Sequence, residues 1–188
     1  MKTILIHITS KVKINDFFNT LKSIDHKSIK LRYIAHKSCL QDTELKKFKN
    51  KIHYKYNDIL DIKSTESELS NDLDKNRVYQ YLDLMLSDPK TISIFERSYF
   101  FYLYNTRRVR IISILFFKII NFLKKMNVKA YVLGSTPHGI NEYLFKWACL
   151  ALDIDVVYLQ ESLLPWRFYA IIEKQTNRYL LANGKKWN

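Results

Sequence analysis

Short apolar runs alternate with stretches of helical periodicity along most of this chain. Thr3 to Thr9 and Ile29 to Ala35 are runs of the kind that form buried parallel strands. Residues 129–134 and 155–160 repeat this pattern, and residues 140–151 between them place apolar side chains at helical spacing. Strands that alternate with helices are typical of a parallel sheet. We therefore expect an α/β fold: a Rossmann-like, three-layer domain with a mainly parallel sheet.

The predicted domain covers residues 1–182. A chain of 188 residues with 47% hydrophobic composition can bury one sizeable core. Residues 57–77 are polar and acidic, and we expect them to form a connection or an insertion. Residues 183–188 form a polar tail. The chain has three glycines and three prolines, which argues against a collagen-like or turn-rich all-β protein.

Two loops, one after each strand of the second half, contain the candidate site. In a parallel strand–helix–strand unit both strands end at the same edge of the sheet, where open α/β folds bind their ligands. The first loop places a histidine at the start of the predicted helix, beside backbone N–H groups and the positive end of the helix dipole. The candidate residues of the two loops are Ser135, Thr136, His138 and Gly139, followed by Gln160, Glu161 and Arg167.

His138 and Glu161 are the candidate catalytic residues, because an imidazole or a carboxylate can accept the proton of a hydroxyl group. The candidate substrate-binding residues are Ser135, Thr136, Gly139, Gln160 and Arg167. Arg167 can hold a phosphate or a carboxylate through two parallel N–H donors. Purely structural roles stay open for these residues. His138 could be a turn residue, Gln160 and Glu161 could end the strand, and Arg167 could form an ion pair with Glu173.

Cysteine and glycine usage excludes several classes of site. Cys39 and Cys149 are far apart and the histidines are not clustered, so we expect neither a disulfide framework nor a metal site. Glycine-rich and Walker nucleotide-binding motifs are absent, and we expect no cofactor. The first residues lack the cleavage site of a signal peptide. We expect a cytoplasmic protein with reduced thiols.

The net charge of +13 is unevenly distributed. Residues 89–129 carry 9 Lys and Arg against 1 acidic residue, whereas residues 130–188, which contain the candidate site, carry 6 against 5. Basic residues flank the apolar run Ile111 to Leu123, which at 13 residues is shorter than the roughly 20 needed to span a bilayer. This run is either a buried helix or a helix that lies on an anionic membrane surface. The candidate membrane-surface residues are Arg107, Arg108, Arg110, Lys124 and Lys125.

Motifs in the middle of the chain resemble a known family. They are Tyr81-Leu-Asp-Leu-Met85, Asp88-Pro89, Phe95-Glu96-Arg97, Thr136-Pro137-His138 and Gln160-Glu-Ser-Leu-Leu-Pro-Trp-Arg-Phe168. Together they resemble the N-terminal part of bacterial capsule and surface-polysaccharide biosynthesis proteins that are similar to two-domain GT-B glycosyltransferases. The resemblance covers about residues 78–172 and the first strand.

The resemblance implies an acceptor-side domain of a glycosyltransferase-like protein at the inner face of the bacterial membrane. Its partners would be a saccharide or glycolipid acceptor, an anionic membrane surface, and a second domain or protein that binds the nucleotide sugar. The chain ends at Asn188, where that half would begin, so enzymatic activity of the chain alone stays open. Two alternatives also stay open: a noncatalytic membrane-surface accessory protein, and a basic nucleic-acid-binding module, which no recognisable motif supports.

Overall fold

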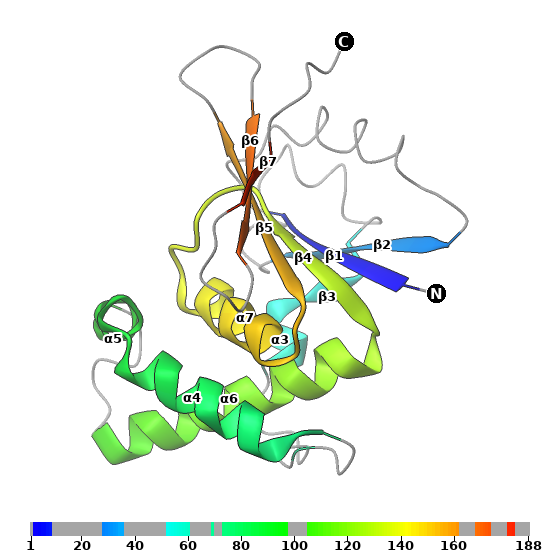
Figure 1. The fold of residues 1–188 in the computed structure, drawn as a ribbon. Helices are drawn as coiled ribbons and strands as arrows, with labels where there is room; N and C mark the ends of the chain where they lie inside the picture. The colour runs from blue at the N-terminus through cyan, green and yellow to red at the C-terminus, as the bar shows by residue number, and fades with distance from the viewer. Residues whose placement is uncertain are drawn as a thin grey trace. The chain divides into compact units, whose positions relative to one another are not determined.

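The computed structural model describes residues 2–8, 28–35, 52–60, 69, 73–97, 105–161, 168–173 and 180–182. These residues form an α/β fold with one mostly parallel sheet (Figure 1). The sheet has seven strands in the order β3-β2-β1-β4-β5-β6-β7. The predicted α/β class with a mainly parallel sheet is therefore confirmed.

The chain divides into two compact units. The first consists of Met1–Asp58, Asn127–Thr136 and Ile154–Asn188, and it contains the sheet. The second consists of Ile59–Met126 and Pro137–Asp153, and it contains the helices α4 to α7.

Five strands of the sheet pair in parallel. They are β1 (Lys2–Ile8), β2 (Ile29–Ala35), β3 (Tyr54–Lys55), β4 (Val128–Leu133) and β5 (Asp155–Glu161). The four longer strands agree with the predicted ones to within one residue at each end. The β4–β5 register runs from Ala130↔Asp155 to Leu133↔Tyr158, so both strands end at the same edge, as predicted.

Two antiparallel strands extend the sheet beyond β5. The strand β6 (Phe168–Glu173) pairs with β5, and β7 (Leu180–Ala182) pairs with β6. The apolar pattern did not predict these two strands, nor the two-residue strand β3.

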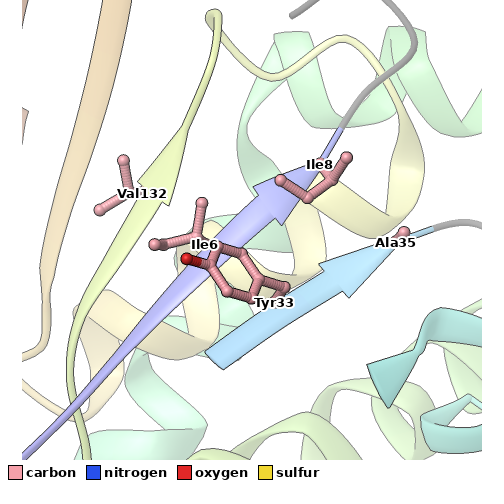
Figure 2. Packing of buried hydrophobic residues seen from close by; sticks show 5 residues of the cluster. All are labelled: Ile6, Ile8, Tyr33, Ala35 and Val132. Carbon is pink, nitrogen blue, oxygen red and sulfur yellow. The ribbon is translucent and has the colours of Figure 1, made fainter. Parts of the chain in front are cut away.

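A cluster of buried apolar side chains lies on one face of the sheet, around its centre. Ile6 and Ile8 of β1, Tyr33 and Ala35 of β2 and Val132 of β4 pack together there (Figure 2). Partly buried apolar side chains surround this cluster: Ile4, Leu31, Ile52, Val157 and Leu159. Successive side chains of a strand point to opposite faces, so the residues between these belong to the other face.

The second unit begins with two capped helices. Asp74 precedes α4 (Lys75–Ser87) and accepts the backbone N–H of Arg77 at 3.1 Å. Asp88 precedes the short helix α5 (Pro89–Glu96), where it accepts the N–H of Lys90 and the hydroxyl of Thr91. A side-chain acceptor at the N-cap satisfies an N–H group that the helix leaves without a partner. α4 thus ends at Ser87, directly before Asp88, and Pro89 begins α5.

The apolar run at 111–123 lies inside the helix α6 (Asn105–Lys125), and most of it is core. Six of its apolar side chains are at most 3% exposed: Ile112, Leu115, Phe116, Ile119, Ile120 and Leu123. A buried stripe of this density leaves these side chains no contact with a lipid surface. For this middle part of the helix, the buried interpretation is confirmed.

The helix α7 (Ile140–Ala151) is buried over more of its surface than its spacing predicted. Tyr143, Leu144 and Ala148 belong to the predicted stripe and are at most 8% exposed. Phe145 and Cys149 lie outside that stripe and are 0% exposed, and the ring of Phe145 meets that of Phe122 of α6 edge to face at 6.2 Å. α7 is thus the central helix in the packing of the second unit.

Candidate functional site

The order of the sheet reverses between β1 and β4. From β1 the chain builds β2 and β3 on one side, and it then returns to place β4 and β5 on the other. In open α/β sheets, ligands bind outside the carboxyl ends of the strands where the order reverses in this way. The candidate site therefore belongs at the edge where β4 ends at Leu133.

Ser135 and Thr136 follow that strand directly. Leu133 is 1% exposed, and the two residues after Gly134 rise toward solvent: Ser135 is half-buried and Thr136 is exposed. A hydroxyl donates one hydrogen bond and accepts two, so this pair can bind the hydroxyl groups of a ligand. The structure thus supports the predicted position of both residues at the carboxyl edge.

Gln160 and Glu161 lie at the same edge, but in a strand. Both are candidates of the second loop, although the predicted strand 155–160 includes Gln160 and a polar strand end was left open as an alternative. They are the last two residues of β5. Gln160 pairs with Tyr169 and Glu161 with Phe168 of the antiparallel strand β6. The hairpin with β6 continues the backbone pairing past the last apolar residue of β5, so the strand extends one residue further than predicted. The backbone still brings both residues to the edge where Ser135 and Thr136 lie.

His138 and Gly139 belong to the second unit, where they directly precede α7 and Gly139 is its N-cap. His138 is exposed, and its backbone N–H donates to a carboxylate oxygen of Glu142 at 2.7 Å. The N–H of Gly139 donates to the same oxygen at 3.3 Å. The two amide groups predicted to attract a phosphate or carboxylate thus have an acceptor within the chain. This arrangement weakens the case for an anion site at the start of α7.

Arg167 lies outside the described residues, and so does the rest of the segment 162–167. Glu173, its predicted ion-pair partner, ends β6 and accepts a short hydrogen bond from the hydroxyl of Tyr158. The structure therefore assigns Glu173 a partner on β5.

A cluster of three aromatic side chains in the first unit was not predicted. His7 of β1 is 1% exposed, and its ring meets that of Tyr56 edge to face at 5.1 Å. The ring of Tyr131 of β4 lies nearly parallel to that of His7 at 6.5 Å. The hydroxyl groups of Tyr56 and Tyr131, both fully buried, are hydrogen-bonded at 2.7 Å. Tyr56 begins the short helix α3 (Tyr56–Ile59), which this bond ties to the sheet.

The only visible signal for this cluster is a polar residue in a strongly apolar run. His7 lies between Ile6 and Ile8 in the sequence of β1, and its side chain belongs to the face opposite the apolar cluster of Figure 2. Sequence spacing alone does not reveal which residues contact His7, because these residues are distant in the chain: Tyr56 and Tyr131 are themselves 75 positions apart.

Cys149 carries no nucleophilic function in this arrangement. Its side chain is fully buried in α7, and burial raises the pKa of the thiol well above its usual value. The thiolate is the reactive form of cysteine, so this thiol is inert in the folded protein.

The five predicted membrane-surface residues lie at the two ends of α6. Arg107 and Arg110 are exposed near its start and Arg108 is half-buried, whereas at its end Lys124 is half-buried and Lys125 exposed. A helix rises 1.5 Å per residue, so the two groups are separated by roughly 20 to 27 Å along the axis. They do not form one surface patch around the apolar run.

No helix in the described part of the chain is long and apolar enough to cross a membrane. Among the same residues, no group of three or more His, Cys, Asp and Glu side chains is placed to hold a metal ion. Comparisons with protein-family models, with curated proteins and with solved structures find no match to this chain. The resemblance of residues 78–172 to polysaccharide biosynthesis proteins therefore stays a prediction.

Proposed function

We propose that this chain is the acceptor-side domain of a glycosyltransferase-like protein of bacterial capsule or surface-polysaccharide biosynthesis. The observation that carries the proposal is the parallel pairing of β4 with both β1 and β5. This pairing supports a ligand site at the carboxyl edge, and the residues there are hydroxyl, amide and carboxylate groups. Such groups suit a neutral ligand rich in hydroxyls, which is the chemistry of a saccharide acceptor.

The chemistry at this edge would be recognition and proton transfer. The hydroxyls of Ser135 and Thr136 would donate to and accept from the hydroxyl groups of the acceptor. Glu161 would accept the proton of the reacting hydroxyl. The sugar donor would be bound by a separate domain or protein.

Saccharide binding tests the proposal without the donor-binding half. Saturation-transfer NMR would be recorded on the full chain with neutral oligosaccharides released from bacterial capsules. Thr136→Val keeps the shape of the side chain and removes one hydroxyl, so the affinity should fall about two- to tenfold, the value of one hydrogen bond. Glu161→Gln should weaken binding about tenfold or more, because hydrogen bonds to a charged acceptor are stronger.

The matched control is Thr106→Val, which removes an exposed threonine hydroxyl from α6 in the second unit. This control should leave saccharide binding unchanged. If no neutral saccharide binds, or if Thr106→Val weakens binding as much as Thr136→Val, the proposed function is wrong.

A further inference from the structure

The start of α6 differs from the rest of the helix in what it exposes. From Ile112 onward the apolar side chains of the helix are mostly core, but Val109 is 45% exposed. Arg107 and Arg110, on either side of Val109, are exposed as well. Thr106, Arg107, Val109 and Arg110 lie within about 160° of one another around the helix, at 100° per residue, and we call them the α6 start face.

Helix stability does not account for these arginines. The first turns of a helix carry partial positive charge, so a cation there is unfavourable and an acidic residue is preferred. The first turn of α6 contains no acidic residue, and neither does the rest of its sequence from Asn105 to Lys125. The positive side chains therefore add to the positive end of the helix dipole, and the two together favour a negatively charged partner.

The exposed apolar side chain narrows the class of partner. An anionic bilayer offers negative headgroups for the two arginines and an apolar layer for the valine at the other edge of the face. Single-stranded nucleic acid is bound by a positively charged groove combined with exposed aromatic rings on which bases stack. On α6 the phenylalanines 116, 117 and 122 are buried or half-buried, so its start face offers charge but no stacking surface.

We propose that the α6 start face is a docking surface for anionic lipid bilayers. Arg107 and Arg110 contact lipid phosphates, and the side chain of Val109, at the opposite edge of the face from Arg107, enters the interface. The rest of α6 stays in the core of the second unit, so the contact is peripheral. This surface lies on a different element from the saccharide site and does not rest on the proposed function.

Vesicle co-sedimentation of the full chain tests the arginines. Vesicles of phosphatidylglycerol and phosphatidylcholine would be compared with pure phosphatidylcholine, at low and at physiological salt. Arg107→Gln with Arg110→Gln should weaken binding to the anionic vesicles about thirtyfold, because each basic residue near the surface contributes about a factor of five. Lys124→Gln with Lys125→Gln makes the same change of charge at the other end of the helix, and it should change binding less than about threefold.

A second pair of variants tests the apolar contact. Val109→Asn should weaken binding to the anionic vesicles about fivefold, because roughly half of a valine side chain is left to be buried. Ile92 of α5 is exposed to a similar extent, 42%, and lies on another helix, so Ile92→Asn should leave vesicle binding unchanged. Thermal melts of all variants should agree with the parent, since every substituted side chain except Lys124 is exposed.

Three results would overturn the proposal. Equal losses from the arginine and lysine pairs would mean that binding follows net charge and has no docking surface. Equal binding to neutral and anionic vesicles would exclude headgroup recognition. Tighter binding of an oligothymidine than of vesicles, lost in the arginine pair, would assign the same face to nucleic acid.

Discussion

Two buried phenols, those of Tyr56 and Tyr131, are joined by the hydrogen bond that ties α3 to the sheet. Tyr56→Phe should lower the free energy of unfolding by about 1–3 kcal/mol, because the hydroxyl of Tyr131 then loses a partner in a buried place. Tyr131→Phe should have a similar effect. Urea denaturation measures both.

The double variant shows whether the two hydroxyls act as a pair. When both hydroxyls are removed, neither tyrosine position keeps a buried hydroxyl that has lost its partner. The double variant should therefore lose about 1 kcal/mol or more less free energy of unfolding than the sum of the two single losses. Strictly additive losses would mean that each hydroxyl is held by other neighbours and that the bond between them contributes little.

The raised pKa of Cys149 predicts both its reactivity and a pH dependence. In a Cys39→Ser variant, the thiol of Cys149 should resist alkylation at pH values both below and above the usual pKa of a cysteine. It should react only when the protein unfolds. Above the usual thiol pKa the unfolded chain ionises while the folded thiol stays neutral. The free energy of unfolding should therefore fall as pH rises through that range, and Cys149→Ala should remove this part of the slope. Rapid alkylation of the folded variant would contradict the inference.

At the scale of elements, the start of α7 depends on Glu142 more than on His138. The carboxylate of Glu142 accepts the N–H groups of both His138 and Gly139. Glu142→Ala should destabilise the protein by about 0.5–2 kcal/mol, as the loss of a cap does. His138→Ala should change the free energy of unfolding by less than about 0.5 kcal/mol, because the side chain is exposed. If His138→Ala proves to be the more destabilising of the two, the histidine holds the turn.

The two turns that lead from helix to strand contain a left-handed residue. Asn127 before β4 has φ 49°, and Asp153 before β5 has φ 57°. Alanine is less stable than aspartate in this conformation, so Asp153→Ala should cost about 1 kcal/mol, whereas Asp153→Gly should be neutral or stabilising. Thermal melts of both variants check the order. An alanine variant as stable as the glycine variant would contradict the assigned conformation.

The sequence predicted elements whose signal is local. The strands β1, β2, β4 and β5 are largely apolar, and α7 has apolar side chains at helical spacing, so the sequence signal of each lies within the element itself. The strands β3, β6 and β7 are short or lie outside such runs, and they form only because another strand is already in place to pair with them. The same reason explains why β5 extends one residue further than predicted, to Glu161.

At the scale of the whole molecule, the sequence predicted at which edge of the sheet β4 and β5 end together, but not which side chains cluster elsewhere. Ser135 and Thr136 follow from strand topology, which a parallel strand–helix–strand unit fixes. The cluster of His7 with Tyr56 and Tyr131 depends on the packing of residues far apart in the chain, which periodicity does not encode. The division of basic residues between two ends of α6 likewise became visible only when the middle of the helix proved to be core.

The central claim is that a saccharide acceptor binds at the carboxyl edge of β4 and β5. The most direct measurement is a titration of the ¹⁵N-labelled chain with capsule oligosaccharides, followed through its amide resonances. The account predicts shifts at Ser135, Thr136 and Glu161, and none at Lys129 or Asp155, which lie at the amino ends of the same strands. Shifts confined to the amino ends, or no shift with any saccharide, would contradict it.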